Sequence, residues 1–526
     1  QGAPTDDLPD LSLTDKGEGK RTINSWHEKQ RILSFFGRLN YDFKDKYLLS
    51  FVFRRDGYSS LLGDNRWGFF PGVSAGWIFG REDFIKEAIP VMSFGKLRAS
   101  YGINGNASGI GAYTLQGSYG SSNSNGSFNY NGNTSYLITE LPNPNLRWEK
   151  TATFEVGADL SFFANRLNTN LTYYNRLTSD KYAALSFPTS TGFSSVTNNN
   201  GEFRNQGIEI ELSGKIIDSK DWTWSASGNI AFNKNKIVSL PDNGMERNRI
   251  NAFQVYTGNG DEKKWVGGQQ EGQEPGILYL YQADGIYRSY DEIPANLVRK
   301  YGSRTYYGPE AWNKLTAEQQ NATTNFPIQP GDTKFHDVNG DDVIDEFDKV
   351  KVGATSPRWT GGFNTTLRWK NFQLYGRFDY ALGFWLYENS GTQSTTPWFM
   401  GCYQGTYNTP TMYYDTWSES NPNAKYPRYL FADQNGKNNY IASTMFAYRG
   451  DYLAIREISL SYSLPESVAK MLKMQRAEVS ITGQNLGYIT GAKNVGSPEA
   501  NPKDNGAVGQ GYSLPRTILF GVNLTF

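Results

Sequence analysis

The sequence predicts an all-β fold: a transmembrane antiparallel β-barrel, of which this chain forms about thirteen strands. Three observations predict it. Apolar and polar residues alternate in long runs, short turns alternate with long polar connections, and no apolar run is long enough for a membrane-spanning helix. The mean hydropathy is negative, as in soluble proteins, but a barrel gives the same average because half of each strand faces water. The alternation therefore decides the fold class.

The alternating runs have an apolar side without charged residues. Most of them extend for about nine to eleven residues, the length that a strand tilted by roughly 45° needs to cross a bilayer. Strands of soluble proteins are usually shorter, about five or six residues. In one run, Phe154, Val156, Ala158, Leu160 and Phe162 oppose Glu155, Gly157, Asp159 and Ser161; the others fall in 35–43, 47–54, 97–103, 222–233, 372–382 and 518–526.

The connections alternate between short turns and long loops. Short turns are expected at 44–46, 163–165, 218–220 and 370–371. Outer-membrane barrels have short periplasmic turns and long extracellular loops, so the last strand should run inward and end at Phe526 in the periplasm. The long polar stretches are 104–147, 178–204, 234–357, 385–450 and 487–513.

No change of composition divides the chain, so residues 1–526 are expected to be one portion of a single barrel domain. Residues 1–31 should be an extracellular loop, and 234–357 and 385–450 large extracellular loops. Single-chain bacterial barrels have an even number of strands, and lipid does not tolerate open sheet edges. About thirteen strands therefore predict that another segment completes the cylinder. The first residues lack a signal peptide, which we expect upstream.

Charge and cysteine usage exclude several functions. Lys+Arg and Asp+Glu both number 52, so the basic excess typical of a nucleic-acid-binding protein is absent. The single cysteine, Cys402, cannot form a disulfide within the chain. The chain has only two histidines, His27 and His336, so together with Cys402 it cannot supply the four ligands of a Cys/His zinc site. No carboxylate spacing singles out an acid/base pair, so we expect neither an enzyme nor an organic cofactor.

The segment DVNGDDVIDEFD, 337–348, has the spacing of a calcium-binding loop. Oxygen ligands at alternating positions allow a tight loop to wrap one large cation. Two departures weaken the match, because Asp342 replaces the usual glycine and Asp348 replaces the bidentate glutamate. An acidic solvated turn is the alternative. The expected ligands of a structural Ca2+ are Asp337, Asn339, Asp341, the carbonyl of Val343, Asp345 and Asp348.

Aromatic residues gather in the loop 397–417. Rings at the mouth of a barrel can stack on sugar faces or peptide side chains. Packing within the loop, or against a partner protein, is the alternative. Trp222 and Trp224 are interpreted instead as residues of the aromatic belt at the membrane boundary. The candidate substrate-binding residues are Trp398, Phe399, Tyr403, Tyr407, Tyr413, Tyr414 and Trp417.

Several stretches occur in a characteristic order along the chain. They include FFGRLNYDFKDKYLLSFVFRRDGYSS (35–60), NRWGFFPGVSAGWIFGREDF (65–84), LPNPNLRWEKTATFEVGADLSFF (141–163), NQGIEIEL (205–212), GDTKFHDVNGDDVIDEFDK (331–349), RGDYLAIREISLSYSLP (449–465), ITGQNL (481–486) and PRTILFGVNLTF (515–526). Together they resemble the SusC/RagA family of TonB-dependent outer-membrane transporters.

The resemblance implies that this chain is the C-terminal part of a barrel of about 22 strands. About nine strands and a plug domain would then lie upstream. It also implies a SusD-like surface lipoprotein as partner, outer-membrane lipid around the strands, and energy from TonB, contacted through the missing N-terminal part. Phe526 would belong to the signal that directs barrel insertion, although an ordinary apolar strand end is an equal alternative for that residue.

The leading functional hypothesis is TonB-dependent import of a bulky nutrient, an oligosaccharide or an oligopeptide, across the cell outer membrane. The alternative is a secreted, calcium-stabilised β-rich glycan-binding protein or glycan-active enzyme. A third possibility is an iron-chelate receptor on the same fold, without a lipoprotein lid. A transporter should require detergent and copurify with an upstream polypeptide, whereas a secreted protein should be soluble and fold completely within these residues.

Overall fold

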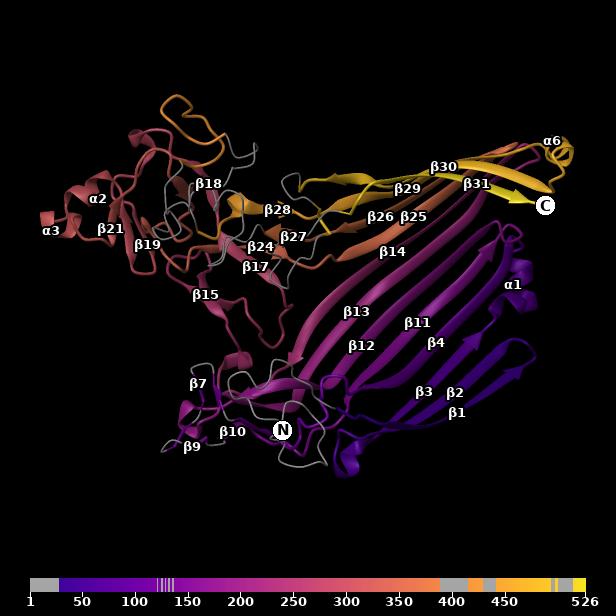
Figure 1. Ribbon diagram of the computed structural model, residues 1–526, viewed down its shortest axis with the longest axis horizontal. Coiled ribbons are helices and arrows are strands. Elements are labelled where there is room, and N and C mark those ends of the chain that lie inside the picture. The colour runs from indigo at the N-terminus through magenta and orange to yellow at the C-terminus, as the bar shows by residue number, and fades with distance from the viewer. Residues whose placement is uncertain are drawn as a thin grey trace.

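The computed structural model describes residues 28–120, 137–387, 415–428, 441–492, 497–499 and 514–526, with two-residue strand pieces between 122 and 134. Its main feature is a curved antiparallel sheet of thirteen strands (Figure 1), which confirms the predicted fold class and strand number. The strands are β1 (Ile32–Phe43), β2 (Tyr47–Tyr58), β3 (Trp67–Trp77), β4 (Met92–Asn106), β11 (Glu149–Phe162), β12 (Leu167–Ser186), β13 (Ser195–Asp218), β14 (Trp222–Ser239), β25 (Trp359–Trp369), β26 (Phe372–Leu382), β29 (Tyr452–Ser463), β30 (Arg476–Thr490) and β31 (Thr517–Thr525).

Each of these strands pairs with the next one along the chain, so the sheet is a simple meander. Within the described residues, β1 and β31 each have a single neighbour in this sheet and do not pair with each other. The sheet therefore ends in two open edges. Large apolar side chains remain exposed on both edge strands, among them Phe36 on β1 and Phe520 on β31.

The short connections all lie at one end of the sheet, which we call the turn end. The predicted turns are confirmed to within one residue. Lys44 and Asp45 adopt left-handed backbone conformations, with φ of 55° and 53°, because the chain must reverse within three residues. The short helices α1 (Asp83–Ala88) and α6 (Glu466–Met471) and the C-terminus lie at the same end (Figure 1). No described helix has the length and apolarity to cross a membrane.

The strand register keeps apolar side chains on one side of the sheet, which we call the outer face. In one row across five strands, each residue stands directly opposite the next, and all five side chains are exposed and uncharged. A contiguous apolar surface of this kind is not stable in water. The outer face therefore has the character of a lipid-facing surface. The row consists of Leu39, Phe51, Val73, Tyr101 and Phe154.

Aromatic pairs bound the outer face at both ends. At the turn end Trp222 stacks on Trp369, with ring centroids 5.7 Å apart, as predicted for a belt residue. At the opposite end, which we call the loop end, Phe232 packs on Trp359 at 4.7 Å. Residues 222 and 232 of β14 are separated by about 33 Å along the strand, or roughly 25 Å across a bilayer at the usual tilt. The band between the aromatic pairs therefore matches the apolar height of an outer-membrane barrel.

One predicted loop is wrong over most of its length. The stretch 178–204 was expected to be a loop, but β12 continues to Ser186 and β13 begins at Ser195. β14 likewise continues to Ser239, so the expected loop 234–357 begins six residues later. Beyond the loop-end aromatic pair neither face of a strand meets lipid. The apolar alternation therefore stops, although the backbone pairing continues.

The long connections at the loop end fold into a compact unit, which we call the loop module (residues 240–358, 385–387, 415–428 and 441–449). It lies beyond the loop end of β14, β25 and β26 (Figure 1). Its helices are α2 (Pro309–Asn313) and α3 (Ala317–Gln320). Its strands are β15 (Phe253–Tyr256), β16 (Lys263–Val266), β17 (Ile277–Tyr281), β18 (Ala283–Ile286), β19 (Val298–Tyr301), β20 (Arg304–Tyr307), β21 (Asn325–Pro327), β22 (Thr333–Phe335), β23 (Val343–Ile344), β24 (Lys349–Ala354), β27 (Trp385–Tyr387) and β28 (Ala447–Arg449).

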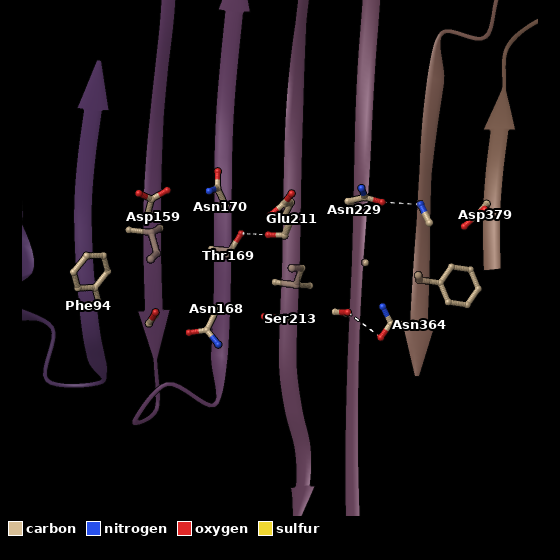
Figure 2. A pocket seen from close by; sticks show the side chains of 17 residues that line it. Phe94, Asp159, Asn168, Thr169, Asn170, Glu211, Ser213, Asn229, Asn364 and Asp379 are labelled. Carbon is tan, nitrogen blue, oxygen red and sulfur yellow. Dashed lines mark hydrogen bonds between the residues drawn. The ribbon is translucent and has the colours of Figure 1, made fainter. Parts of the chain in front are cut away.

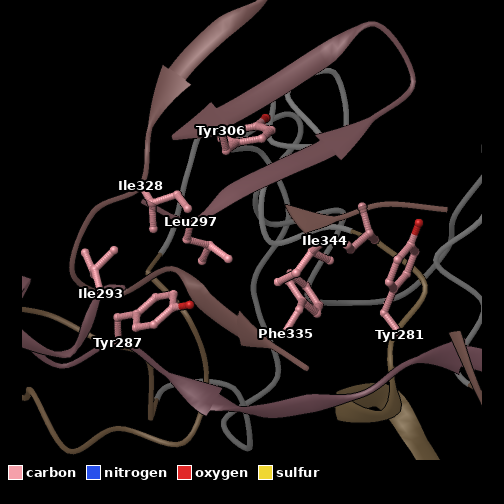
Figure 3. Close-up of a cluster of buried hydrophobic side chains, with 9 residues drawn as sticks. Tyr281, Tyr287, Ile293, Leu297, Tyr306, Ile328, Phe335 and Ile344 are labelled. Carbon is pink, nitrogen blue, oxygen red and sulfur yellow. The ribbon is translucent and has the colours of Figure 1, made fainter. Parts of the chain in front are cut away.

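The loop module has hydrophobic cores of its own. Figure 3 shows the larger one, which includes Tyr287, Leu297 and Phe335, all less than 5% exposed. Arg299 is also buried there, and its guanidinium lies 4.5 Å from the ring centre of Tyr306. A second core brings together Leu280, Tyr387, Tyr426 and Phe446 from four distant segments. The described parts of the predicted loops 234–357 and 385–450 thus pack together.

A smaller unit covers the loop end of β2, β3 and β4. Its core joins Tyr58, Leu61 and Phe70 to Trp148, whose ring packs edge-on against Phe70 at 5.4 Å. The unit lies at the loop end on the β1 side of the sheet. Its short strands are β5 (Ser118–Gly120), β6 (Ser122–Asn123), β7 (Gly126–Ser127), β8 (Asn129–Tyr130), β9 (Asn133–Thr134) and β10 (Leu137–Glu140).

Candidate functional site

The polar side of the sheet, which we call the inner face, carries a row of residues that crosses seven neighbouring strands. Each member stands directly opposite the next, because successive antiparallel pairs keep one register. Figure 2 shows the row from Asp159 to Asp379, with carboxylates and amides at one level of the sheet. The row consists of Lys96, Asp159, Asn170, Glu211, Asn229, Gly362 and Asp379.

A second row, two residues nearer the turn end, is uncharged across its centre. Ser227 donates a hydrogen bond to the side-chain oxygen of Asn364 at 3.0 Å. The two rows line a shallow depression of about 560 Å3 (Figure 2). Such a surface offers many weak hydrogen bonds to hydroxyl and amide groups. The central part of the second row consists of Ser161, Asn168, Ser213, Ser227 and Asn364.

Arg98 crosses the neighbouring strand and binds three groups of the inner face. Its Nε donates to Asp159 Oδ1 at 3.2 Å, and its Nη2 donates to Asn170 Oδ1 at 2.8 Å and to Thr172 Oγ1 at 2.5 Å. The guanidinium lies over Gly157, where a Cβ atom would fall 2.7 Å from Arg98 Cζ. Gly157 is therefore required for the close approach, and Arg98 offsets the charge of Asp159.

The other end of the first row is also neutralised, but its centre is not. Arg456 Nε donates to Asp379 Oδ2 at 2.7 Å. Glu211 is exposed between Asn170 and Asn229 and forms no ion pair with any residue that the structure describes. An exposed carboxylate between two amides can accept hydrogen bonds from hydroxyl or ammonium groups of a passing solute.

The acidic segment 337–348 forms a tight loop in the loop module. Asp337 accepts backbone N–H groups from Gly340 and Asp342, both at 2.8 Å. Asp342 has a φ of 60°, the left-handed conformation that glycine usually supplies at this position of a calcium loop. Asp348 accepts N–H groups from Val338 and Asp345, and burial raises its pKa to about 6.

A residue from outside the segment also reaches this loop. The side-chain amide of Asn339 donates to Asp261 Oδ1 at 2.9 Å, while its Oδ1 is buried and accepts no hydrogen bond from the described residues. Nowhere in the described ranges do three His, Cys, Asp or Glu side chains lie close enough together to hold a metal ion as they stand. The six candidate ligands lie in one turn, with carboxylates that largely cap backbone amides.

Of the seven candidate stacking residues, six lie outside the described residues: Trp398, Phe399, Tyr403, Tyr407, Tyr413 and Tyr414. The seventh, Trp417, belongs to the loop module. Its backbone N–H donates to the carbonyl of Tyr426 at 2.9 Å, and its ring packs against Gly331, where a Cβ atom would fall 2.5 Å from the indole. Trp417 therefore packs within the loop module, and its contact with a solute stays a prediction.

The sequence reasoning missed the two arginines that bind across the inner face. Arg98 lies in the alternating run 97–103, which predicts only that one side of the strand is polar, and nothing in the alternation marks Gly157 beneath its guanidinium. Arg456 stands beside Glu457 in β29, where two consecutive charged residues break the period of two. That break was the available signal, because it marks a β-bulge.

Comparisons with known proteins agree with this geometry. Residues 3–306, more than half of the chain, match the family described as TonB dependent receptor-like, beta-barrel. The chain is 29% identical to TonB-dependent receptor P3 of Formosa agariphila over 96% of its own length and 46% of the relative. It is 27% identical to TonB-dependent receptor SusC of Bacteroides thetaiotaomicron, over 96% and 45%.

A solved structure shares the fold over nearly the whole chain. The structure described as the RagAB peptide transporter superposes with a TM-score of 0.68 at 22% identity, covering 99% of this chain and 50% of the other. This chain spans about half the length of the curated relatives it matches. With the exposed apolar band and the thirteen-stranded meander, these matches establish that the chain belongs to the TonB dependent receptor-like β-barrel family of the outer membrane.

Proposed function

We propose that the chain forms part of the wall of an outer-membrane importer for a bulky polar nutrient, an oligosaccharide or an oligopeptide. The observation that carries this proposal is the pair of cross-strand rows on the inner face. They place hydroxyls, amides and one unpaired carboxylate opposite an apolar outer face. Many weak hydrogen bonds suit a solute that must bind and then leave. The proposed transporter draws its energy from TonB, as the names of its relatives suggest.

The proposal includes an upstream segment of the same protein that completes the cylinder. The open edges of β1 and β31 carry backbone groups that lipid cannot solvate. About nine further strands would close a barrel of the size expected for this family. A plug domain from the same segment would fill the lumen and provide the contact with TonB. The half-length match to the relatives agrees with this arrangement.

We further propose that a SusD-like surface lipoprotein covers the loop end. The loop module supports this idea, because its own hydrophobic cores make it a firm surface for a partner. The aromatic loop 397–417 would face that partner or the solute between them. RagAB, described as a peptide transporter, supports nutrient import, and the polar inner face leaves both oligosaccharide and oligopeptide as cargo classes.

The function is tested with the full-length protein in its own outer membrane. Cells with and without the gene are supplied with labelled oligosaccharides and oligopeptides, and uptake is compared in the presence and absence of TonB. Uptake of one class should depend on both the gene and TonB. Glu211→Gln and Asn229→Leu should alter the uptake of that class. Unchanged uptake of every solute class after deletion of the gene would contradict the proposal.

We also propose that the loop 337–348 binds a structural Ca2+. The support is the ligand spacing, the left-handed Asp342, and the buried Asn339 oxygen that lacks a donor among the described residues. Asp337, Asn339, Asp341, Asp345 and Asp348, with the Val343 carbonyl, would hold the ion. Its role would be to fix the loop module, because Ca2+ prefers a flexible cage of oxygen ligands and supplies no redox chemistry.

A further inference from the structure

We infer that Ser497–Glu499, a described segment between β30 and β31, is pinned to the inner face of the barrel by Arg456, where it narrows the passage. This inference rests on the proposed function only for its effect on solute passage. The structure describes this segment apart from the residues on either side of it. Its position depends on a β-bulge, on an ion pair with little exposure to water, and on a cross-strand row of small and polar residues.

A β-bulge gives Arg456 its direction. In the pairing of β26 with β29, Phe378 stands opposite Ile455 and Arg377 stands opposite Glu457, so Arg456 is an extra residue. Ile455 keeps to the outer face and Glu457 to the inner face. The bulge therefore turns a second charged side chain inward, where Arg456 Nε donates to Asp379 Oδ2 at 2.7 Å. In a regular strand, two consecutive side chains such as those of Arg456 and Glu457 would point to opposite faces.

The guanidinium binds a second carboxylate, from the connection itself. Arg456 Nη2 donates to Glu499 Oε1, and the hydroxyl of Tyr488 donates to Glu499 Oε2 at 3.2 Å. The side chains of Arg456 and Glu499 are 14% and 19% exposed, so water screens this ion pair weakly. Ser497 is 3% exposed and also contacts the Tyr488 hydroxyl. The segment is therefore packed against the wall.

The wall at this point belongs to the inner face. Asp379, Ala454 and Tyr488 stand in one cross-strand row, and Asp379 is the same residue that ends the row of Figure 2. Ala454 is only 1% exposed, although the inner face around the depression is open. Asp379 lies three residues from Leu382, the loop-end residue of β26. The segment thus enters the barrel below the loop-end rim.

Arg456 is the residue that holds this arrangement together. Without the guanidinium, Asp379 and Glu499 would face each other with no cation between them, and repulsion would drive Ser497–Glu499 away from the wall. Exchanging the two charges preserves the attraction between positions 456 and 499. The ion pair can therefore be removed in a single variant and restored in a double variant with exchanged charges.

The test measures the accessibility of Ser497→Cys to a membrane-impermeant maleimide in intact cells. It uses the full-length protein with its native cysteines, Cys402 included, replaced by serine. Labelling should be slow when Arg456 is present. It should become about tenfold faster, or more, in Arg456→Ala, because a charge-assisted hydrogen bond is lost. The double variant Arg456→Glu/Glu499→Arg should restore slow labelling.

A matched control is Arg449→Ala, which removes a 2.6 Å ion pair with Asp451 on an exposed side chain of the neighbouring segment. It should leave the labelling rate unchanged. Equal rates with and without Arg456, or fast labelling of the parent protein, would overturn the inference. The labelling does not depend on transport, so a failure of the proposed function would appear separately, as absent uptake. If both hold, Arg456→Ala should admit larger solutes than the parent protein.

Discussion

Trp222 and Trp369 stand directly opposite each other across β14 and β25 and stack at 5.7 Å, yet each remains 43% exposed. Two large indoles left open together are typical of a membrane boundary and not of a soluble surface. Phe372 continues the stack from Trp369 at 6.0 Å. The aromatic series therefore marks the turn-end boundary of the lipid band.

The position of this boundary predicts a fluorescence result. In bilayers that contain lipids with a quencher near the headgroup, emission from Trp222 and Trp369 should be quenched more than in bilayers quenched near the centre. The difference between the parent protein and the Trp222→Phe/Trp369→Phe variant isolates the two indoles. Equal quenching at both depths, or none, would place the aromatic series outside the interface.

A pH dependence is predicted at the turn end. Lys46 Nζ lies 2.7 Å from Glu82 Oε2, and the Tyr47 hydroxyl donates to Oε1 at 2.9 Å. Hydrogen bonds lower the pKa of Glu82 from 4.5 to about 2. The bond from Lys46 contributes most, and the bond from Tyr47 contributes next. A lowered folded-state pKa stabilises the protein above pH 4.5, and this stability is lost as the pH falls toward 2.

Thermal unfolding of the detergent-solubilised protein as a function of pH checks this prediction. Glu82→Gln should lower stability at neutral pH and flatten the decline between pH 4.5 and pH 2. Glu87→Gln, whose carboxylate forms no ion pair within the described residues, should keep the parent profile. An identical acid profile for the parent and Glu82→Gln would contradict the assignment.

The loop module should be destabilised separately from the barrel. Leu297 is 4% exposed in the core shown in Figure 3. Leu297→Ala should cost the module about 2–5 kcal/mol, through lost burial and the cavity that remains. Limited proteolysis should then cut the module faster, while the barrel keeps its heat-dependent shift in electrophoretic mobility. Leu297→Met is the volume-conserving control; a loss of the barrel itself in Leu297→Ala would show that the two parts fold as one.

Calcium should stabilise the loop module in the parent protein. Added Ca2+ should raise the melting temperature of the module, by linkage to a ligand that binds the folded state alone, and a chelator should reverse the rise. Asp345→Asn should abolish the response, because it removes one carboxylate of the proposed cage. Asp284→Asn, a carboxylate outside the loop, should retain it. No response in the parent protein would leave the loop as an acidic turn.

The alternation was sufficient to predict the strands where lipid lies on one side and the lumen on the other. In β11, Phe154 and Glu155 face opposite surroundings, so period two follows directly from the environment. The same reasoning failed at 178–204. There neither side of β12 and β13 meets lipid, and the strands are held by backbone pairing and by polar contacts such as those of the buried Asn199 with Arg147 and Asp180.

The loop module was beyond sequence reasoning for a different reason. Its core forms between residues distant in the sequence, such as Leu280 and Phe446, and each contributing strand is only a few residues long. The inner face was predicted as a polar surface, but its specific contacts were not. Arg98 depends on the absence of a side chain at Gly157, and Arg456 depends on a bulge that local periodicity shows only as an irregularity.

The central claim is that lipid solvates the outer face and water solvates the inner face. Phe363 and Asn364 test it directly, because they are consecutive residues of β25 that point to opposite faces. In the full-length protein, Phe363→Lys should cost about 2–4 kcal/mol and sharply reduce the folded barrel recovered from the outer membrane, whereas Asn364→Lys should be tolerated. Equal recovery of the two variants, or a greater loss for Asn364→Lys, would contradict the assignment of the faces.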